Sequence, residues 1–343
     1  MDATVVLSRA DVQQQLDLRE CIDAVEHAFR LHAVGQTIVP GVLGTHVDGG
    51  GFHVKTAGLR PTGDRTPVFA TKINANFPGN PKRRGLPTIQ GVIALFDATD
   101  GRVLALLDSI EITSIRTAAA TAVAAKYLAR IDPKVVTICG CGEQGRSQLR
   151  AILCVRPVQR VNAFDVDADR ATAYAAEMSR ELGIPVTAIS ALGEQTRDTD
   201  IWITCTPAHR WFLGREHVRP GAFIAAVGAD NGDKQEVEPE LLASSVVIAD
   251  VLDQCASIGD VHHALVAGVM RREDVRAELA EIVSGTQPGR LSDDEIIIFD
   301  STGTALEDVA AAAIVYERAL RSRAGVSIAL GNQTQPHVEL VRR

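Results

Sequence analysis

The stretch Val135-Val-Thr-Ile-Cys-Gly-Cys-Gly-Glu-Gln-Gly145 decides the fold of this chain. Its first five residues are uncharged and mostly β-branched, which predicts a short buried strand. Gly140, Gly142 and Gly145 follow with the G-x-G-x-x-G spacing. In that pattern the first glycine permits a tight turn, the second lets the backbone approach a pyrophosphate, and the third lets the next helix pack closely. The stretch therefore predicts a dinucleotide-binding turn.

Asp165 supports this interpretation because it closes a second apolar run, over 161–165, about 25 residues beyond the first glycine. A helical stretch over 146–154 lies between the two runs. A carboxylate in this place can accept hydrogen bonds from an adenosine ribose. No Arg sits directly beside Asp165 to receive a 2′-phosphate, so we expect NAD(H) rather than NADP(H).

The composition excludes several classes of protein. At 343 residues the chain is long enough for two domains with substantial cores. Its net charge of −8 comes without a basic patch, so we expect no nucleic-acid partner. No apolar run approaches the roughly 18 residues of a membrane span, and residues 1–10 lack the basic and apolar regions of a secretion signal. We therefore expect no membrane partner and a cytoplasmic location.

The six cysteines show neither a C-x-x-C pair nor a histidine at zinc spacing. Reduced thiols, three of them (139, 154 and 205) in apolar runs, are the simplest interpretation. We therefore expect no metal site.

The chain changes character near residue 133. Before it, a short strand and an amphipathic helix over 1–35 precede Gly- and Pro-rich sequence with alternating runs at 52–56, 68–73, 91–96 and 102–107, typical of an antiparallel or mixed sheet. An Ala-rich helix over 111–130 leads into regular strand–helix alternation. The strands expected there lie at 135–139, 161–165, 185–188, 200–205, 222–227, 246–249 and 296–299. A second Ala-rich helix follows over 301–324.

These patterns predict an α/β protein with two domains. Residues 126–304 form an NAD-binding Rossmann domain, which is a doubly wound parallel sheet. Residues 1–125 together with 305–343 form a discontinuous α+β domain for substrate binding and dimerisation, because the helix after residue 304 is expected to pack back on the first domain.

Three cations of the first domain lie in apolar or small-residue sequence: Lys55, Lys72 and Arg116. Isolated cations in such surroundings are either paired structural ions or ligands of an anionic substrate. Three of them beside a nicotinamide-binding domain favour a substrate carboxylate.

Two segments follow strands of the predicted parallel sheet, at the edge where ligands bind in such folds. The loop over 226–236 offers Asp230 as a general acid or base and Lys234 as a contact to cofactor or carboxylate; its Asp-Asn-Gly-Asp sequence also suits a solvated turn. The segment over 299–304 contains Ser301, Thr302 and Thr304, and its hydroxyls and amides either cap the next helix, which is the simpler explanation, or touch the nicotinamide.

Several motifs occur together and in consistent order over residues 35–315. They are Lys72, Asn80-Pro81, Gly85-Leu-Pro-Thr88, Asp108, Thr113, Arg116-Thr-Ala-Ala119, Lys126-Tyr-Leu-Ala129, Gly140–Gln144, Val227-Gly-Ala-Asp230, Asp300-Ser301 and Gly303-Thr-Ala305. With these motifs the chain resembles the ornithine cyclodeaminase/mu-crystallin family.

The resemblance implies NAD(P)(H) binding and chemistry at the α-carbon–nitrogen bond of amino or imino acids. The family includes ornithine and lysine cyclodeaminases, alanine dehydrogenases and ketimine reductases. Its members are typically homodimers that assemble through the domain outside the Rossmann fold. We therefore expect a small amino- or imino-acid substrate and a homodimer.

The resemblance also assigns roles to single positions. Asp230 corresponds to the family's catalytic acid/base, and Lys72 and Arg116 to its substrate-carboxylate pair, so we take Asp230 and Lys72 as catalytic candidates. Arg116, Lys55, His53 and Thr302 are the substrate-binding candidates. The cofactor-binding candidates are Thr88, Gly140, Gly142, Glu143, Gln144, Gly145, Asp165, Thr206, Val227, Lys234 and Ser301.

The substrate pocket departs from the family pattern at three positions. Val42 stands where ornithine cyclodeaminases carry an Arg that holds the carboxylate, and His53 where they carry a Glu for the distal ammonium. Lys55 replaces a common Met. Lys55 either replaces the missing Arg or binds a second acidic group.

Three functions compete. The leading one is an NAD(H)-dependent ketimine reductase or amino-acid dehydrogenase. The first alternative is a cyclodeaminase of ornithine or a related diamino acid, which releases ammonia with catalytic NAD. The second is a mu-crystallin-like ligand-binding protein, which is disfavoured because such proteins carry Ser at the position of Asp230.

Overall fold

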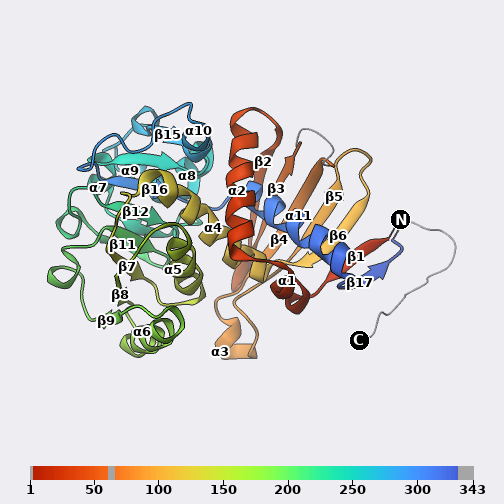
Figure 1. Cartoon of the computed structure of the whole chain (residues 1–343), viewed down its shortest axis with the longest axis horizontal. Coiled ribbons are helices and arrows are strands. Elements are labelled where there is room, and N and C mark those ends of the chain that lie inside the picture. Colours follow the sequence, from red (N-terminus) through yellow and green to blue (C-terminus); the bar gives the residue numbers. More distant parts are fainter. Residues whose placement is uncertain (1–2, 61–65, 331–343) are drawn as a thin grey trace. The chain divides into compact units, whose positions relative to one another are not determined.

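The computed structural model describes residues 3–60 and 66–330. The chain divides into two compact units, Met1–Arg116 with Thr304–Arg343 (unit 1) and Thr117–Gly303 (unit 2). The first division falls inside helix α4 (Ile110–Leu128), after Arg116, whereas the sequence placed the boundary after residue 125. Figure 1 shows the elements of both units.

Unit 1 contains a seven-stranded mixed sheet in the order β17-β1-β6-β5-β4-β3-β2. Strand β1 pairs with β6 in parallel, and the other neighbours are antiparallel. The strands are β1 (Thr4–Leu7), β2 (Thr37–Val47), β3 (Gly50–Leu59), β4 (Val68–Asn76), β5 (Ile89–Asp97), β6 (Val103–Asp108) and β17 (Val326–Ile328).

Helix α11 (Ala305–Ser322) contacts strands β3, β4 and β5 and helix α2 (Leu18–Ala33). The strand register shows why one face of the sheet suits this helix. Lys55, Lys72, Ile93 and Leu107 lie opposite one another on successive strands and all are buried. Since side chains alternate between the faces of a sheet, this row faces the helix.

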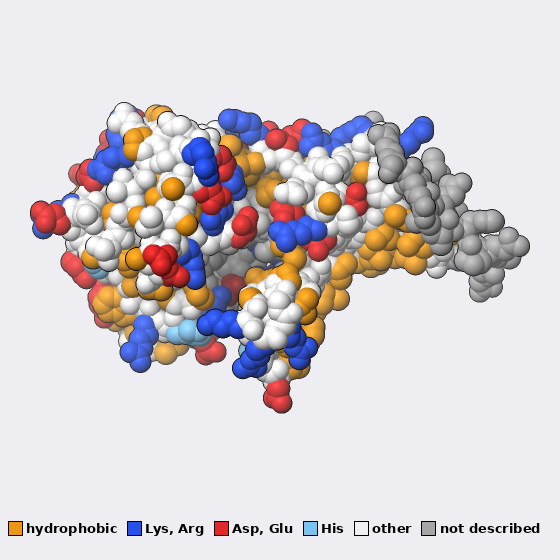
Figure 2. Space-filling view, turned by 90° about the horizontal axis from the view of Figure 1, so that it is seen from below, with side chains coloured by type: hydrophobic (Ala, Val, Ile, Leu, Met, Phe, Trp, Pro, Cys, Tyr) orange, Lys and Arg blue, Asp and Glu red, His pale blue; other side chains and the backbone are white. Residues whose placement is uncertain are grey.

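The neighbouring row points to the other face. Leu43, Val54, Ile73 and Val92 are opposite one another on β2 to β5. Leu43 is 63% exposed, Ile73 41% and Val92 39%. Figure 2 shows hydrophobic side chains gathered on unit 1 in this view. Contiguous exposed apolar area of this kind marks an interaction surface.

Unit 2 contains an eight-stranded sheet in the order β15-β14-β16-β12-β10-β7-β8-β9, in which all pairs are parallel. This order confirms the expected α/β fold with a doubly wound sheet. The strands are β7 (Val135–Cys139), β8 (Arg160–Phe164), β9 (Val186–Ile189), β10 (Ile201–Thr204), β12 (Phe223–Ala226), β14 (Val246–Ala249), β15 (Ala277–Glu278) and β16 (Ile297–Asp300), with β11 (His209–Leu213) and β13 (Gln235–Val237) as a separate pair.

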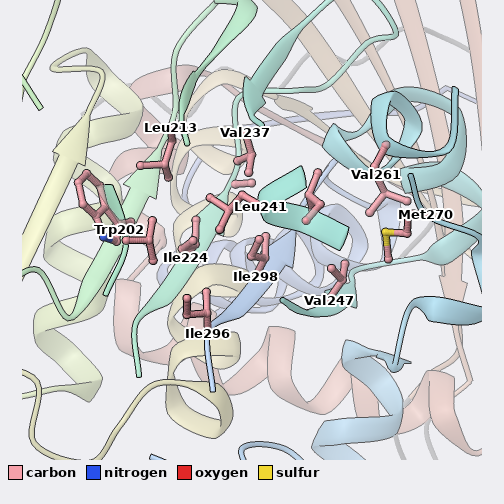
Figure 3. Close-up of a cluster of buried hydrophobic side chains, with 14 of the residues drawn as sticks. Trp202, Leu213, Ile224, Val237, Leu241, Val247, Val261, Met270, Ile296 and Ile298 are labelled. Carbon is pink, nitrogen blue, oxygen red and sulfur yellow. The ribbon is translucent and has the colours of Figure 1, made fainter. Parts of the chain in front are cut away.

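A cluster of buried apolar side chains joins this sheet to the elements beside it (Figure 3). Trp202, Ile224 and Ile298 come from the sheet, and Leu241 and Val261 come from helices α7 (Pro239–Ala243) and α9 (Asp260–Val266). The remaining α-helices are α1 (Arg9–Gln15), α3 (Asn80–Arg84), α5 (Glu143–Val155), α6 (Ala168–Leu182), α8 (Leu252–Ile258) and α10 (Leu279–Ser284).

Strand β2 was not expected from the sequence, because Pro40, Gly41 and Gly44 interrupt any alternation of polar and apolar residues. It is the edge strand of its sheet, a place where a proline is tolerated.

The single helix expected within 1–35 is two helices in the structure. Asp17 caps the second one, α2, because its side chain accepts hydrogen bonds from the amides of the first turn. All six cysteines are free thiols. Among the described residues, no helix is long and apolar enough to cross a bilayer.

Candidate active site

The three glycines of the loop after β7 differ in what they permit. Gly140 has φ +105°, and a Cβ there would lie 2.7 Å from the Cys205 carbonyl oxygen. A Cβ on Gly145 would collide with the Gly140 carbonyl oxygen, so the absence of a side chain here allows the first turn of α5 to pack closely on the loop. Gly142 faces open space and begins α5 without a side-chain cap. The first turn of α5 therefore keeps its amides available for a phosphate.

Asp165 lies directly beside this loop. Its Oδ2 accepts a hydrogen bond of 2.9 Å from the Cys141 amide, and its Oδ1 accepts one of 3.0 Å from the Asp167 amide. Helix α6 brings Arg170 Nη1 to 3.6 Å from Asp165 Oδ1. The preference for NAD(H) over NADP(H) was argued from the absence of an Arg beside Asp165 in the sequence. In the structure Arg170 lies near Asp165, so that argument no longer holds. The Asp165 carboxylate is bound to the Cys141 amide of the glycine loop, and its role toward a ribose stays a prediction.

Further polar atoms of unit 2 suit a dinucleotide. Ser301 follows β16, and its Oγ is buried without a hydrogen-bond partner in the described residues. The same holds for Oε1 of Gln144 in the first turn of α5. Together with the glycine loop, these unsatisfied groups fit an NAD(H) molecule that the chain would hold at this edge. Glu143 is exposed beside Gln144, Val227 is buried after β12, and Thr88 of unit 1 is half-buried before β5.

Glu236 ties two loops of this edge together. Its Oε1 accepts hydrogen bonds of 2.6 Å from both the amide and the hydroxyl of Thr206, which follows β10. Its Oε2 accepts one of 2.8 Å from the Gly228 amide, two residues before Asp230. A Cβ on Gly228 would collide with this carboxylate. The carboxylate is fully buried, and burial raises the pKa of Glu236 despite the hydrogen bonds from Thr206.

Two more buried carboxylates continue this arrangement. Asp260 Oδ1 accepts from the amides of Glu236 and Val237, at 2.8 and 2.9 Å. Asp300, the last residue of β16, accepts from the amides of Asp260 and Val261 at 3.3 and 2.9 Å. Burial and then the neighbouring carboxylate raise the pKa of both Asp260 and Asp300. We call Glu236, Asp260 and Asp300 the carboxylate chain.

Asp230 stands at the end of the loop that Glu236 holds. The Lys234 Nζ donates to Asp230 Oδ1 at 2.7 Å, and the Asp230 side chain is 49% exposed. The Nε2 of His263 lies 2.8 Å from the Lys234 carbonyl oxygen, which fixes the backbone of that residue. The pair therefore places a solvent-accessible carboxylate beside an ammonium on a braced loop.

Thr302 is buried within unit 2. Its Oγ1 lies 3.1 Å from Asp250 Oδ1 and accepts a hydrogen bond of 2.8 Å from Gln254 Nε2. The helix cap is Thr304, whose Oγ1 accepts from the Leu306 amide. The structure therefore confirms the capping expected of this segment, with Thr304 as the residue that caps the helix.

Unit 1 brings the isolated cations together around α11. The Lys72 Nζ lies 2.8 Å from Asp308 Oδ1, and Arg116 Nε lies 2.9 Å from the same oxygen. Arg116 Nη1 also donates to Glu307 Oε2 at 2.6 Å. All four side chains are at least 95% buried. Lys55, 8% exposed, is the direct cross-strand neighbour of Lys72. We call these five side chains the ion cluster.

The cluster shifts the titration of its members. Burial lowers the pKa of Lys72 to about 7, Arg116 and Lys55 add to this effect, and Asp308 opposes it. Burial alone would raise the pKa of Asp308, but Arg116 and Lys72 hold that pKa below its usual range. The described residues include no group of three or more His, Cys, Asp or Glu side chains that could hold a metal ion.

Sequence reasoning missed Glu236, Glu307 and Asp308. Glu307 and Asp308 form an acidic pair near the start of an Ala-rich helix, and this pair next to isolated cations elsewhere was the available signal. Glu236 gives no such signal, because only the fold brings it to Thr206 and Gly228. His53 lies on the same face as Lys55, opposite Asn74.

Comparisons of the sequence and of the structure with known proteins lead to the same family. The model of the ornithine cyclodeaminase/mu-crystallin family matches residues 2–323. The alanine dehydrogenase of Archaeoglobus fulgidus is 36% identical over 325 residues, which cover 95% of this chain and 98% of that protein. A solved archaeal alanine dehydrogenase dimer with bound NAD has a TM-score of 0.90 at 36% identity, covering 96% and 99% of the two chains.

Two reductases are also similar in structure. The Thermococcus litoralis Δ1-pyrroline-2-carboxylate reductase, in complex with NADH and L-proline, has a TM-score of 0.89 at 34% identity, covering 94% of this chain and 99% of that one. The iminosuccinate reductase of Paracoccus denitrificans, in complex with NAD+, has a TM-score of 0.85 at 30% identity, covering 95% and 99%. This chain therefore belongs to the ornithine cyclodeaminase/mu-crystallin family.

Proposed function

We propose that this protein is an NAD(H)-dependent oxidoreductase that acts on the carbon–nitrogen bond of a small α-imino or α-amino acid. The observation that carries the proposal is the ion cluster, which buries three cations around two carboxylates in a family member with a dinucleotide loop. The relatives with bound NAD, NADH or L-proline support the same chemistry.

In this proposal Lys72 and Arg116 bind the substrate carboxylate. A charge-assisted and partly bidentate contact to Arg116 fixes the orientation of the carboxylate. Asp308 holds both cations in place, because it lies 2.8 Å from Lys72 Nζ and 2.9 Å from Arg116 Nε. Fixing the substrate in this way contributes several kcal/mol of the roughly 7–11 kcal/mol that orientation can supply.

Asp230 handles the proton on the substrate nitrogen. The cofactor, when bound, supplies or accepts the hydride at the α-carbon. In imine reduction Asp230 delivers a proton to the nitrogen or holds the protonated nitrogen in place, and in amine oxidation it accepts one. Lys234, whose Nζ lies 2.7 Å from Asp230 Oδ1, holds this carboxylate in its orientation between turnovers.

We also propose that the protein is a homodimer. The exposed apolar row on β2 to β5 of unit 1 is a suitable contact surface, and the archaeal alanine dehydrogenase is a dimer. Sedimentation of the purified protein, and of a Leu43→Glu variant that places a charge in the row, tests this assignment.

The activity is tested by following NADH at 340 nm and ammonia together. Pyrroline- and piperideine-2-carboxylate, and pyruvate with ammonia, are offered with NADH; ornithine, lysine and alanine are offered with NAD. Stoichiometric loss of NADH with an imine establishes the reductase. Ammonia release from ornithine or lysine without net change in NADH establishes the cyclodeaminase instead. Tight NADH binding with no turnover of any substrate leaves only a ligand-binding protein.

A further inference from the structure

The parallel sheet of unit 2 has a cavity at the edge opposite the glycine loop. The cavity has a volume of about 520 Å³ and lies at the amino ends of four neighbouring strands, β7, β10, β12 and β16. Small-molecule sites commonly have volumes of about 300–1,000 Å³. The glycine loop, Thr206 and Ser301 follow the carboxyl ends of strands in the same sheet, so the cavity is separate from the dinucleotide edge.

Two arginines share one buried aspartate in the lining of the cavity. Arg130 precedes β7, Asp200 precedes β10 and Arg219 precedes β12. Both arginines donate from Nη2 to Asp200 Oδ1, while Asp200 Oδ2 accepts from the amides of Lys134 and Val135 at 2.7 and 3.0 Å. Burial alone would raise the pKa of Asp200, but these amides and Arg219 hold that pKa below its usual range. Asp200 is therefore an ionised carboxylate whose two oxygens are both in use.

The arginine pair, Arg130 and Arg219, keeps donors for a further anion. Each guanidinium has five N–H groups in a planar fork, and each gives Asp200 a contact from one Nη. The Nε atoms of both arginines are buried and have no hydrogen-bond partner within the described residues. Buried donors without a partner are rare in native proteins. The pair therefore suits a second carboxylate beside Asp200.

The same lining contains carboxylates that are exposed to solvent. Asp132 Oδ2 lies 4.0 Å from the Nζ of Lys134, and both side chains are exposed. Asp198 is exposed as well and pairs with Arg160. These contacts at the surface are weak because water screens them, so Asp132 can accept hydrogen bonds from a ligand.

Asp293, before β16, is a third exposed carboxylate of the lining. Its charge acts on Arg290, which is not part of the lining and donates to backbone carbonyl oxygens. The cavity thus presents the arginine pair and several carboxylates to the same ligand. A molecule with one kind of charge would be attracted by one part of this lining and repelled by the other.

We propose that this cavity binds a small α-amino acid as a zwitterion, with its carboxylate on Arg130 and Arg219 and its ammonium on Asp132 and Asp293. An α-amino acid carries one charge of each sign on the same carbon, and charge-assisted hydrogen bonds can form at both. The inference stands apart from the proposed function, because it uses neither the ion cluster nor the loop over 226–236.

The experiment compares L-alanine with propionate, which lacks the ammonium, and with ethylamine, which lacks the carboxylate. Each compound is titrated into the full-length protein, and amide hydrogen exchange is measured by mass spectrometry, which resolves segments of the chain. Residues 130–135 and 217–222 report the cavity. Residues 226–236 contain Asp230 and report the candidate active site separately.

Two variants and a control accompany the wild type. Arg219→Met removes one guanidinium and leaves Asp200 with its other donors. A combined Asp132→Asn and Asp293→Asn variant removes two exposed charges and keeps the size of both side chains. Arg180→Met, at an exposed arginine of α6, is the matched control. Circular dichroism checks that each variant is folded.

We expect L-alanine to slow exchange at both cavity segments with a Kd of about 1 mM or below. Propionate and ethylamine should bind there at least about tenfold more weakly, since each lacks one charge-assisted contact. Arg219→Met and the combined variant should lose a similar factor, and Arg180→Met should match the wild type.

Slower exchange with L-alanine at 226–236 alone, or at no segment, overturns the inference. Equal protection by propionate overturns the assignment of an amino acid, because the ammonium would then contribute nothing. The same holds if neither variant weakens the protection at the cavity segments. The comparison of the three compounds in the wild type decides the matter even if Arg219→Met fails to fold.

Discussion

The two units each bury a group of carboxylates, but they neutralise them differently. In unit 1 Asp308 and Glu307 face the side chains of Lys72 and Arg116. In unit 2 the carboxylate chain accepts its hydrogen bonds from backbone amides and from the Thr206 hydroxyl. In unit 1 an incoming anion can compete with Asp308 and Glu307 for the cations. In unit 2 the hydrogen bonds from the amides fix the loops in place.

The difference suggests distinct purposes. Side-chain ion pairs can exchange partners with a charged ligand, since the cations keep further donors after pairing with Asp308. Amides bound to Glu236 and Asp260 belong to the loop backbone, so breaking those bonds moves the loop itself. We therefore assign recognition of charge to the ion cluster and positioning of residues to the carboxylate chain.

The largest expected effect comes from Asp308→Asn. This change leaves Lys72 and Arg116 buried without their shared carboxylate, and breaking a buried ion pair typically costs about 3–5 kcal/mol. Urea unfolding should show a loss of this size. The control is Asp100→Asn, which breaks a pair with Arg102 in which both side chains are about half exposed; its cost should stay below about 1 kcal/mol. Equal losses in the two variants would contradict the role of burial.

Glu236→Gln tests the carboxylate chain. The amide replaces one acceptor with a donor, so either Thr206 or Gly228 loses its partner, at a cost of about 1–3 kcal/mol. Displacing the loop before Asp230 by about 1 Å should lower kcat by up to about 100-fold. Turnover should fall more than the KM for the imine rises. Glu240→Gln, at an exposed position of α7, should leave all three quantities unchanged. A loss of stability with full turnover would show that Glu236 serves folding only.

The pH dependence of carboxylate binding separates the ion cluster from the carboxylate chain. Burial lowers the pKa of Lys72 to about 7, so the folded protein releases this proton between pH 7 and the ordinary lysine range near 10.5, where the unfolded chain still holds it. Lys72 therefore adds stability as pH rises through that window, while affinity for a carboxylate falls. Inhibition by pyruvate without ammonia should weaken by up to about tenfold per pH unit above 7.

Lys72→Arg provides the comparison, because a guanidinium stays charged over this range. Its inhibition by pyruvate should be nearly independent of pH between 6 and 9. If the wild type shows the same flat profile, Lys72 does not titrate near neutrality or does not contact the carboxylate.

Most of the fold could be predicted from the sequence. The strands of unit 2 are short, continuous apolar runs, as expected for strands buried on both faces, and seven of them lie where the sequence places them. Strand β2 could not be found, because Pro40, Gly41 and Gly44 interrupt its pattern and a proline argues against a strand except at places such as the edge of a sheet. The pair β11 and β13 begins with polar or charged residues, so no continuous apolar run marks either strand.

The site could be predicted only in part. The spacing of the glycines and of Asp165 identifies the dinucleotide loop. The three cations of unit 1 can be recognised because they lie alone among apolar or small residues. Glu236 and Asp308 cannot be recognised in this way, since Glu236 acquires its role partly from Thr206, 30 residues away, and Asp308 acquires its role from Lys72, 236 residues away. The proximity of Arg170 to Asp165 is likewise a result of the turn into α6.

The most direct test of the account is the Asp230→Asn variant, measured for turnover and for NADH binding by fluorescence. Asp233→Asn, an exposed position in the same loop, is the control. The account predicts that Asp230→Asn loses about 100- to 10,000-fold in turnover while its Kd for NADH stays close to that of the wild type and of the control. Unchanged turnover would contradict the assignment of Asp230 as the acid/base, and with it the proposed mechanism.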